Sequence, residues 1–458
     1  MDRSIHDRRL ARALYLLVAI AFVTGGSAQI SGWDDTVVQL LAVPVLAWAL
    51  WRLAALPASP LRWLALAGAA MVALVPLLQL LPIPAFLWHM PDARQLLADD
   101  LAVFGVVPEF RWSLAPAETE RALLFLLPPL AAFAATLAVG PTAHRRLLTL
   151  VMALAMGSLF LGFAQLGVPE ESVLNPYPEW AALFNGVFAN RNHQGISLVL
   201  ATIIGLAGAL AALPHARDGL RQAWTPWVLG FIALFALCAI PLTGSRGAVL
   251  IAVFAVAAVP TALGQFNRAH LRGSWGARVG LVTCLALVAL GLWATVGWMQ
   301  VEAVDEVRPA LRAATFSLGF EHAPLGTGVG AFVPAFEQGA GDALLLRQYV
   351  NHAHNEYLQW WMEGGVLAVL VAAAVAAILA VLAAAALRVR GPDRVPGVVA
   401  LLCLGALLLH SWVDYPMRTV SLATVATVLA GILAAQATRT SRQALNFVGV
   451  VRTASHTS

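Results

Sequence analysis

The chain has 458 residues, of which 60% are hydrophobic and only 11% are charged. Soluble globular domains carry about 25% charged residues, so this composition excludes a soluble enzyme and predicts an integral membrane protein. The formal net charge of +4 is small and gives no reason to expect nucleic acid as a partner.

Apolar segments follow one another along the whole chain, each close to the ~20 residues that cross a bilayer core. The first begins behind several arginines and resembles a secretory signal peptide, but with so many spans behind it we interpret it as an uncleaved helix. We therefore expect an all-α polytopic protein, a single integral membrane domain covering 1–458, with both termini on one side. The twelve predicted spans are 12–30, 36–52, 63–83, 121–139, 148–167, 194–213, 226–242, 248–264, 279–298, 360–387, 397–411 and 418–436.

Charge predicts the orientation of these spans. If the amino terminus is cytoplasmic, the cytoplasmic segments hold 19 of the 28 arginines but only 4 of the 24 carboxylates. This is the bias that the positive-inside rule describes, so we expect both termini to be cytoplasmic. Three long loops, 84–120, 168–193 and 299–359, then face outward. Within the first, residues 91–100 form an amphipathic stretch that suits the membrane surface.

The outward loop 299–359 ends in a dense polar cluster directly before a long apolar segment. Polar side chains are costly beside a bilayer, so we favour a functional role over a solvent-exposed helix start. A histidine has a suitable pKa to act as a general base. We assign that role to His354, with His352 as the alternative base or a supporting, acceptor-binding residue. The remaining members, expected to bind substrate, are Asn355, Tyr357 and Gln359.

Outward arginines form a second set of candidates. Arg191 and Arg246 have no acidic residue close in sequence, so we expect them to hold a phosphate group through the planar guanidinium fork. Arg308 and Arg312 lie one helical turn apart, and for them pairing with nearby carboxylates is as good an interpretation as substrate binding. Neighbouring residues expected to contact substrate are Asn190, Asn192, His193 and Ser245.

The glycine-rich segment, Asp414 and the cysteines give weaker indications of function. The glycines of 326–330 lack the lysine of a phosphate-binding loop, so we interpret this segment as a turn back toward the membrane. We expect Asp414 to be structural, paired with an arginine. The three cysteines lie in apolar runs, and no cysteine spacing typical of a metal site is present. The outward carboxylates also show no compact acidic motif that would hold magnesium or manganese, so we predict no metal, and we expect no cofactor.

These motifs resemble the O-antigen ligase and polymerase superfamily over roughly residues 180–420; the first third is similar only in hydropathy. The resemblance rests on Asn190-Arg191-Asn192-His193, Thr243-Gly244-Ser245-Arg246-Gly247, Pro324-Leu325-Gly326-Thr327-Gly328-Val329-Gly330, His354-Asn355-Glu356-Tyr357-Leu358-Gln359 and Asp414-Tyr415-Pro416.

The resemblance implies a membrane glycosyltransferase at the periplasmic face of the bacterial cytoplasmic membrane. It would take a glycan from undecaprenyl diphosphate and pass it to an acceptor hydroxyl without an obligatory metal. The acceptor would be lipid A–core, another carrier-linked glycan, or a protein side chain. Loop 299–359 would form the lid and active-site portion.

Transport is the main alternative. A twelve-span transporter of a lipid-linked or small-molecule substrate fits the hydropathy, but such proteins often show related halves, which we do not find here. Their functional charges also lie within spans, whereas these spans are nearly free of charge. A membrane scaffold would leave the histidine and arginine motifs unexplained.

Overall fold

The computed structural model describes residues 3–28, 33–180, 184–216, 218–264, 303–341, 344 and 350–454. Within these ranges the secondary structure is helical apart from one isolated bridge between Pro82 and Arg111, so the all-α prediction is confirmed there. The first helices are α1 Arg3–Thr24, α2 Trp33–Ala54, α3 Pro60–Gln79, α4 Ala85–Trp88, α5 Asp92–Val103, α6 Pro116–Phe125, α7 Leu127–Ala138 and α8 Pro141–Gln165. They are followed by α9 Arg191–Ala212, α10 Leu220–Ala239, α11 Arg246–Ala262, α14 Ala303–Glu321, α15 Phe332–Gly339, α16 Glu356–Leu387, α17 Val395–His410 and α18 Val420–Ala454.

Nine helical stretches in the described ranges are long and apolar enough to cross a membrane, so the chain is a multi-pass membrane protein. They correspond to nine of the twelve predicted spans. Of the other three, 12–30 overlaps the arginine-bearing α1, and 248–264 corresponds to the shorter α11. The third, 279–298, lies outside the described residues. A total of twelve spans therefore remains a prediction.

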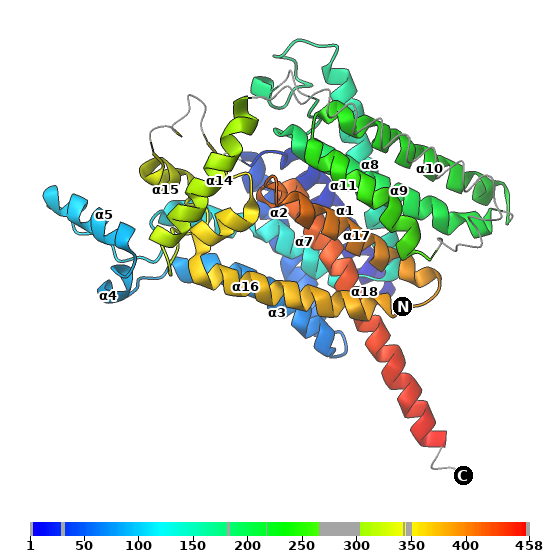
Figure 1. Ribbon diagram of the computed structural model, residues 1–458. Coiled ribbons are helices and arrows are strands. Elements are labelled where there is room, and N and C mark those ends of the chain that lie inside the picture. Colours follow the sequence, from blue (N-terminus) through cyan, green and yellow to red (C-terminus); the bar gives the residue numbers. More distant parts are fainter. Residues whose placement is uncertain are drawn as a thin grey trace.

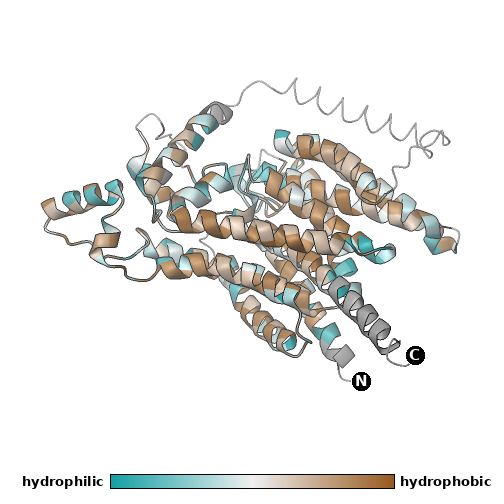
Figure 2. Cartoon of the chain, turned by 60° about the horizontal axis from the view of Figure 1, so that its bottom comes forward, coloured by the Kyte–Doolittle hydropathy of each residue, from teal (hydrophilic) through white to brown (hydrophobic). Residues whose placement is uncertain are grey.

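Buried α9 and α18 form the centre of the bundle, with α8, α10, α11 and α17 around α9 (Figure 1). Helix α18 packs against α7, α16 and α17. Close packing relies on small residues, as is usual between membrane helices. A Cβ added to Gly431 of α18 would lie 2.8 Å from the Thr136 Cβ of α7. Brown, hydrophobic residues dominate the long helices in Figure 2, and teal residues gather toward their ends.

Two helices depart from the predicted spans for local reasons. The span 121–139 is divided into α6 and α7 at Leu126, just before Pro128 and Pro129, because proline lacks the N–H that would continue the helical ladder. Helix α16 contains Gly365 with φ 59° and ψ −151°, a conformation that strongly favours glycine.

The turn at 324–330 docks onto the break in α16. Thr327 N–H donates to the carbonyl of Met362 at 3.0 Å, and Gly328 N–H donates to that of Glu363 at 2.8 Å. In return, Val366 N–H donates to the carbonyl of Pro324 at 3.0 Å. The segment 326–330 is thus a turn packed on a membrane helix, as the sequence predicts.

Polar loops collect at one end of the bundle. Ala189 N–H donates to the Gly26 carbonyl and Ser421 N–H to the Gly25 carbonyl, each at 3.1 Å, while Glu356 N–H donates to the Ser411 carbonyl at 3.0 Å. The segments preceding α9, α16 and α18 therefore meet there.

The arginine-rich segments gather at the opposite end. Arg145 pairs with Asp393 at 2.9 Å, and Arg439 lies 3.4 Å from His144. Helix α17 separates the two ends, since it begins beside Asp393 and ends at His410. These charged residues lie at the end opposite the polar loops, and the predicted orientation, with both termini cytoplasmic, remains a prediction.

Loop 84–120 is attached to the turn at 324–330 by the side chain of Arg94, which is fully buried although α5 projects from the bundle (Figure 1). Its guanidinium donates to the carbonyls of Trp112 and Gly326 and lies 5.5 Å from the Trp88 ring. Leu96 and Phe104 of the same segment are exposed, which suits the predicted membrane-surface location.

Candidate active site

Asp414, on the short connection between α17 and α18, is the centre of a polar cluster at the end of the bundle. Its carboxylate is completely buried and accepts hydrogen bonds from His354 Nδ1 at 3.2 Å and from Asn190 Nδ2 at 3.2 and 3.4 Å. Burial alone would raise the pKa of Asp414, but the hydrogen bond and charge of His354 lower that pKa below the usual range of a carboxyl group. Asp414 is therefore an anion that joins three segments distant in sequence.

His354 precedes α16 in a strained conformation. Its φ of 49° is the only positive φ of a non-glycine residue in the described chain, and such geometry costs on the order of 1–2 kcal/mol. Asn355 follows as the N-cap: its side chain accepts from Leu358 N–H and donates to the Trp412 carbonyl at 3.0 Å. The helix starts where the sequence predicts, and Asn355 locks this start to the Asp414 segment.

The hydrogen bond from His354 to Asp414 decides the tautomer of the imidazole. A carboxylate only accepts, so Nδ1 carries the proton and Nε2 of the neutral ring keeps its lone pair. Nε2 is thus the atom available to accept a proton. The side chain of His354 is 15% exposed, so a substrate can reach the ring.

Four arginines approach this cluster or begin next to it. A Cβ at Gly244 would lie 3.3 Å from Arg191 Nη1, so the Arg191 side chain lies over the turn that leads into Arg246 and α11. On α14, Arg312 donates to the backbone carbonyl of His354 at 3.2 Å. Burial, and next the charge of Arg308, lowers the pKa of Arg312, while Asp414 opposes this shift. Arg308, Arg312 and Asp414 are therefore close neighbours.

Tyr415 separates this cluster from a second histidine site. Its ring is 6% exposed and lies 5.0 Å from the His354 ring, 4.4 Å from the His352 ring and 5.1 Å from the His193 ring. Asn351 Nδ2 donates to the Tyr415 hydroxyl at 3.4 Å, and burial raises the pKa of that hydroxyl. The uncharged ring of Tyr415 thus contacts both His352 and His354 and lies between them.

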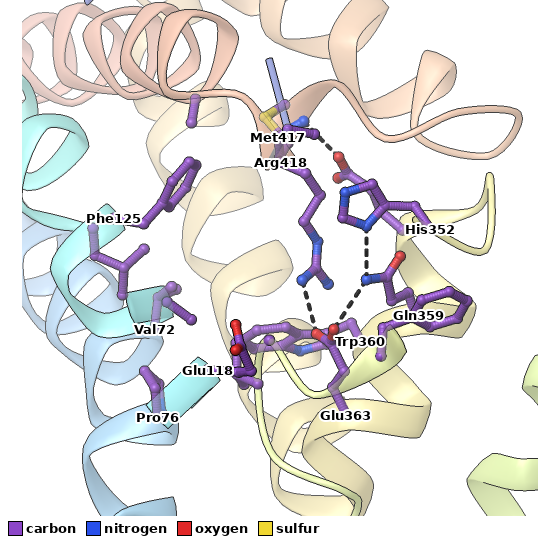
Figure 3. Close-up of a pocket in the computed structure, with 18 of the residues that line it drawn as sticks. Val72, Pro76, Glu118, Phe125, His352, Gln359, Trp360, Glu363, Met417 and Arg418 are labelled. Atoms are coloured by element: carbon purple, nitrogen blue, oxygen red, sulfur yellow. Dashed lines mark hydrogen bonds and ion pairs between the residues drawn. The ribbon is translucent and has the colours of Figure 1, made fainter. Parts of the chain in front are cut away.

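His352 belongs to a hydrogen-bonded chain that runs through Gln359 and Glu363 to Arg418 (Figure 3). Arg418 pairs with the buried Glu363 carboxylate at 2.8 Å, and Glu363 accepts from Gln359 Nε2 at 2.9 Å. Ala353 N–H can only donate, so the Gln359 atom that it contacts at 3.2 Å must be the acceptor Oε1. This contact sets the orientation of the Gln359 amide. The other Nε2 proton of Gln359 therefore points at His352 Nδ1, 3.1 Å away.

This chain gives His352 the opposite tautomer to His354. Nδ1 of His352 accepts, so the proton of the neutral ring lies on Nε2. Burial, and next the charge of Arg418, lowers the pKa of His352 well below its usual value, so the ring is neutral at pH 7. His352 is arranged to donate a hydrogen bond rather than to accept a proton.

A cavity of about 860 Å³ adjoins His352 but does not include His354 among its lining residues. Its polar lining residues include the chain from His352 to Arg418 and the carboxylates of Glu118 and Glu337. Apolar residues of membrane helices also line the cavity. Figure 3 shows Val72 and Pro76 of α3 and Phe125 of α6 facing Arg418 and Glu363 across it.

The remaining predicted site residues have identifiable places. Ser245 is the N-cap of α11 and accepts from Ala248 N–H, and Asn190 caps α9 by accepting from Asn192 N–H. His193 is buried beside Tyr415, while the Tyr357 hydroxyl donates to the Leu408 carbonyl at 2.7 Å. Ser245 and Gln359 thus position other groups: one caps a helix and the other holds His352.

Sequence reasoning missed several members of the site. Glu363 and Arg418 received no role, and Asp414 was expected to be merely structural. His410, buried at the end of α17, also escaped notice, although a Cβ at Gly247 would lie 3.3 Å from its ring. The motif Asp414-Tyr415-Pro416 was the signal that marked this connection. Within the described ranges, no group of three or more histidine, cysteine or acidic residues is arranged to hold a metal ion.

Comparison with known proteins finds a family match for part of this site. Residues 231–373, which include Arg246, Arg312 and His354, match the family model described as O-antigen ligase. The resemblance to the O-antigen ligase superfamily is confirmed. The matched segment is thus similar to enzymes described as O-antigen ligases, and Arg191 and Asp414 lie outside it. A comparison with curated proteins gave no match.

Proposed function

We propose that the protein transfers a glycan from undecaprenyl diphosphate to an acceptor hydroxyl, with His354 as the general base. The observation that carries the proposal is the hydrogen bond between His354 Nδ1 and Asp414, because it leaves Nε2 ready to accept a proton. The family match favours this chemistry over the transporter alternative. We place the site at the periplasmic face of the cytoplasmic membrane, following the charge distribution of the loops.

The reaction follows from these groups. His354 Nε2 takes the proton of the acceptor hydroxyl while its oxygen attacks the anomeric carbon of the donor glycan. The bond from that carbon to the diphosphate oxygen breaks, and its electron pair leaves with undecaprenyl diphosphate. Asp414 stabilises the imidazolium that forms.

The arginines act on the leaving group. Arg191 and Arg246 stabilise the charge that develops on the diphosphate, where water is partly excluded. Arg308 and Arg312 extend this positive surface, and Arg312 also holds the His354 backbone. Segment 299–359 then supplies both the base and two of the four arginines, which is the active-site portion that we propose for it.

Purified enzyme with a carrier-linked glycan tests the proposal. His354→Ala should abolish transfer while binding of undecaprenyl diphosphate persists, because the arginines remain. His352→Ala is the matched control: it should retain measurable turnover and mainly weaken the use of acceptor. Full turnover by His354→Ala together with an inactive His352→Ala would reverse the two assignments, and activity in both would end the histidine-base mechanism.

A further inference from the structure

Helix α14 exposes an apolar stripe on the side opposite its buried face. The buried face, which includes Leu311 and Leu318, packs in one apolar cluster with α15 and α16. The exposed stripe follows the i, i+4, i+7, i+11 spacing of one helix face, within about 60° on the helical wheel. Its members are Pro309, Ala313, Phe316 and Phe320. Phe316 and Phe320 are 51% and 59% exposed, so α14 is apolar on two sides although only one of them is buried.

Polar residues border the apolar stripe on both edges. Arg308 and Arg312 lie along one edge, and Arg312 donates to the carbonyl of His354. Ser317 and Glu321 lie along the other edge, where the Ser317 hydroxyl donates to the Glu321 carboxylate at 3.3 Å. An apolar stripe between polar edges is typical of a helix that lies in the plane of a membrane surface.

The apolar stripe meets a membrane-crossing helix at the depth of the lipid head groups. The Phe320 ring lies 5.2 Å from the Trp361 ring of α16 and 4.9 Å from the Phe316 ring. The indole N–H of Trp361 donates to the Phe316 carbonyl at 3.4 Å. Exposed aliphatic side chains of α16 begin at Val366, about 8 Å further along the helix axis. Tryptophan so close to the lipid-facing surface of a membrane helix is typical of the water–lipid boundary.

Helix α14 runs across α16 rather than along the bundle (Figure 1). Since α16 crosses the membrane, α14 lies along the membrane plane with its apolar stripe next to Trp361. We propose that α14 is an interfacial helix whose apolar stripe is buried in the head-group region of the bilayer, on the side of the candidate active site. Its partner is the lipid surface itself. Because Arg312 of the same helix donates to the His354 backbone, this contact also holds the site in place.

Spin labels at two neighbouring alanines test the location of α14. Ala313 belongs to the apolar stripe, and Ala310, also exposed, lies about 60° away toward the polar edge. Each would be replaced by cysteine in the full chain, in lipid nanodiscs, after Cys238, Cys284 and Cys403 are changed to alanine. The ratio of collisions with oxygen to collisions with a water-soluble nickel chelate rises with depth in a bilayer. We expect this ratio to be at least about threefold higher for Ala313→Cys than for Ala310→Cys.

An equal or lower ratio at Ala313→Cys would overturn the proposal. Low accessibility to both reagents at Ala313→Cys would also overturn it, because the stripe would then be covered by protein.

Two glutamate substitutions test whether the apolar stripe makes the contact. Phe320→Glu places a charge in the stripe and should lower the ratio at Ala313→Cys about threefold or more. Ser317→Glu is the matched control on the polar edge and should leave that ratio unchanged. Equal effects of the two glutamates would rule out the stripe as the lipid-binding surface. These outcomes concern the membrane contact alone and do not depend on whether the protein transfers a glycan.

Discussion

His352 and His354 contact the same Tyr415 ring, at centroid distances of 4.4 and 5.0 Å, but their hydrogen bonds hold opposite tautomers. His354 donates through Nδ1 to a carboxylate, whereas His352 accepts at Nδ1 from an amide. Two chemically identical side chains, two residues apart, are thereby prepared for different tasks. The hydrogen-bond partner of each ring, Asp414 or Gln359, rather than the position of the histidine in the sequence, makes that division.

The first prediction concerns the tautomer of His354. Asp414→Asn keeps the size of the side chain but lets an amide N–H face Nδ1, so the Nε2 lone pair is lost in the neutral ring. We expect turnover to fall by roughly 10³- to 10⁴-fold with little change in donor binding. The measurement is kcat together with the Kd of undecaprenyl diphosphate. A variant with more than a tenth of wild-type turnover would show that Asp414 does not orient the base.

The second prediction concerns the leaving group. Arg246→Lys keeps the charge but loses the planar fork, so we expect a severe loss of glycan transfer, about 100-fold or more, with normal membrane insertion. Arg145→Lys, at the opposite end of the bundle, is the control and should be fully active. Near-normal transfer by the Arg246 variant would mean that charge alone suffices or that the residue is peripheral.

The third prediction concerns stability and pH. The folded pKa of His352 lies below its unfolded value of about 6.5, so only the unfolded chain binds this proton as the pH falls below 6.5. The depressed pKa of Asp414 acts in the same direction at lower pH, below about 4. The unfolding temperature should therefore decline on acidification from pH 7 to 5. His352→Gln should show a shallower decline over that range, and an unchanged slope would contradict a neutral buried His352.

The fourth prediction concerns the attachment of loop 84–120. Arg94→Met leaves the carbonyls of Trp112 and Gly326 without their buried donor, which should cost about 3 kcal/mol and open the loop to protease. Arg111→Met is the control, since Arg111 forms an exposed ion pair with Glu109. Limited proteolysis and the unfolding temperature report both effects. Equal protease resistance in the two variants would show that Arg94 does not hold the loop.

The sequence was most informative where a single local rule decides the structure. Hydropathy gives nine of the described membrane helices, charge separates the two ends, and a polar residue before an apolar run marks the start of α16 at Glu356. The division between α6 and α7 follows from adjacent prolines and could have been predicted as well.

The site itself depends on long-range contacts that no local rule contains. Asn190 and His354 reach Asp414 across 224 and 60 residues, and Glu363 meets Arg418 only because α16 and α18 pack together. A single aspartate between two apolar segments gives no sign of its partners. The sequence could therefore predict His354 as the base, but it could not identify Asp414 as the carboxylate that sets the tautomer of His354.

The break at Gly365 limits where segments can be exchanged between related enzymes. The turn at 324–330 supplies backbone hydrogen bonds to Met362, Glu363 and Val366, so a segment outside the bundle completes the ladder of a membrane helix. A chimera that exchanges the outer loop and stops at the membrane boundary would combine the turn at 324–330 of one enzyme with the α16 break of another. Grafts should instead carry the loop and the first eleven residues of α16, through Val366, as one unit.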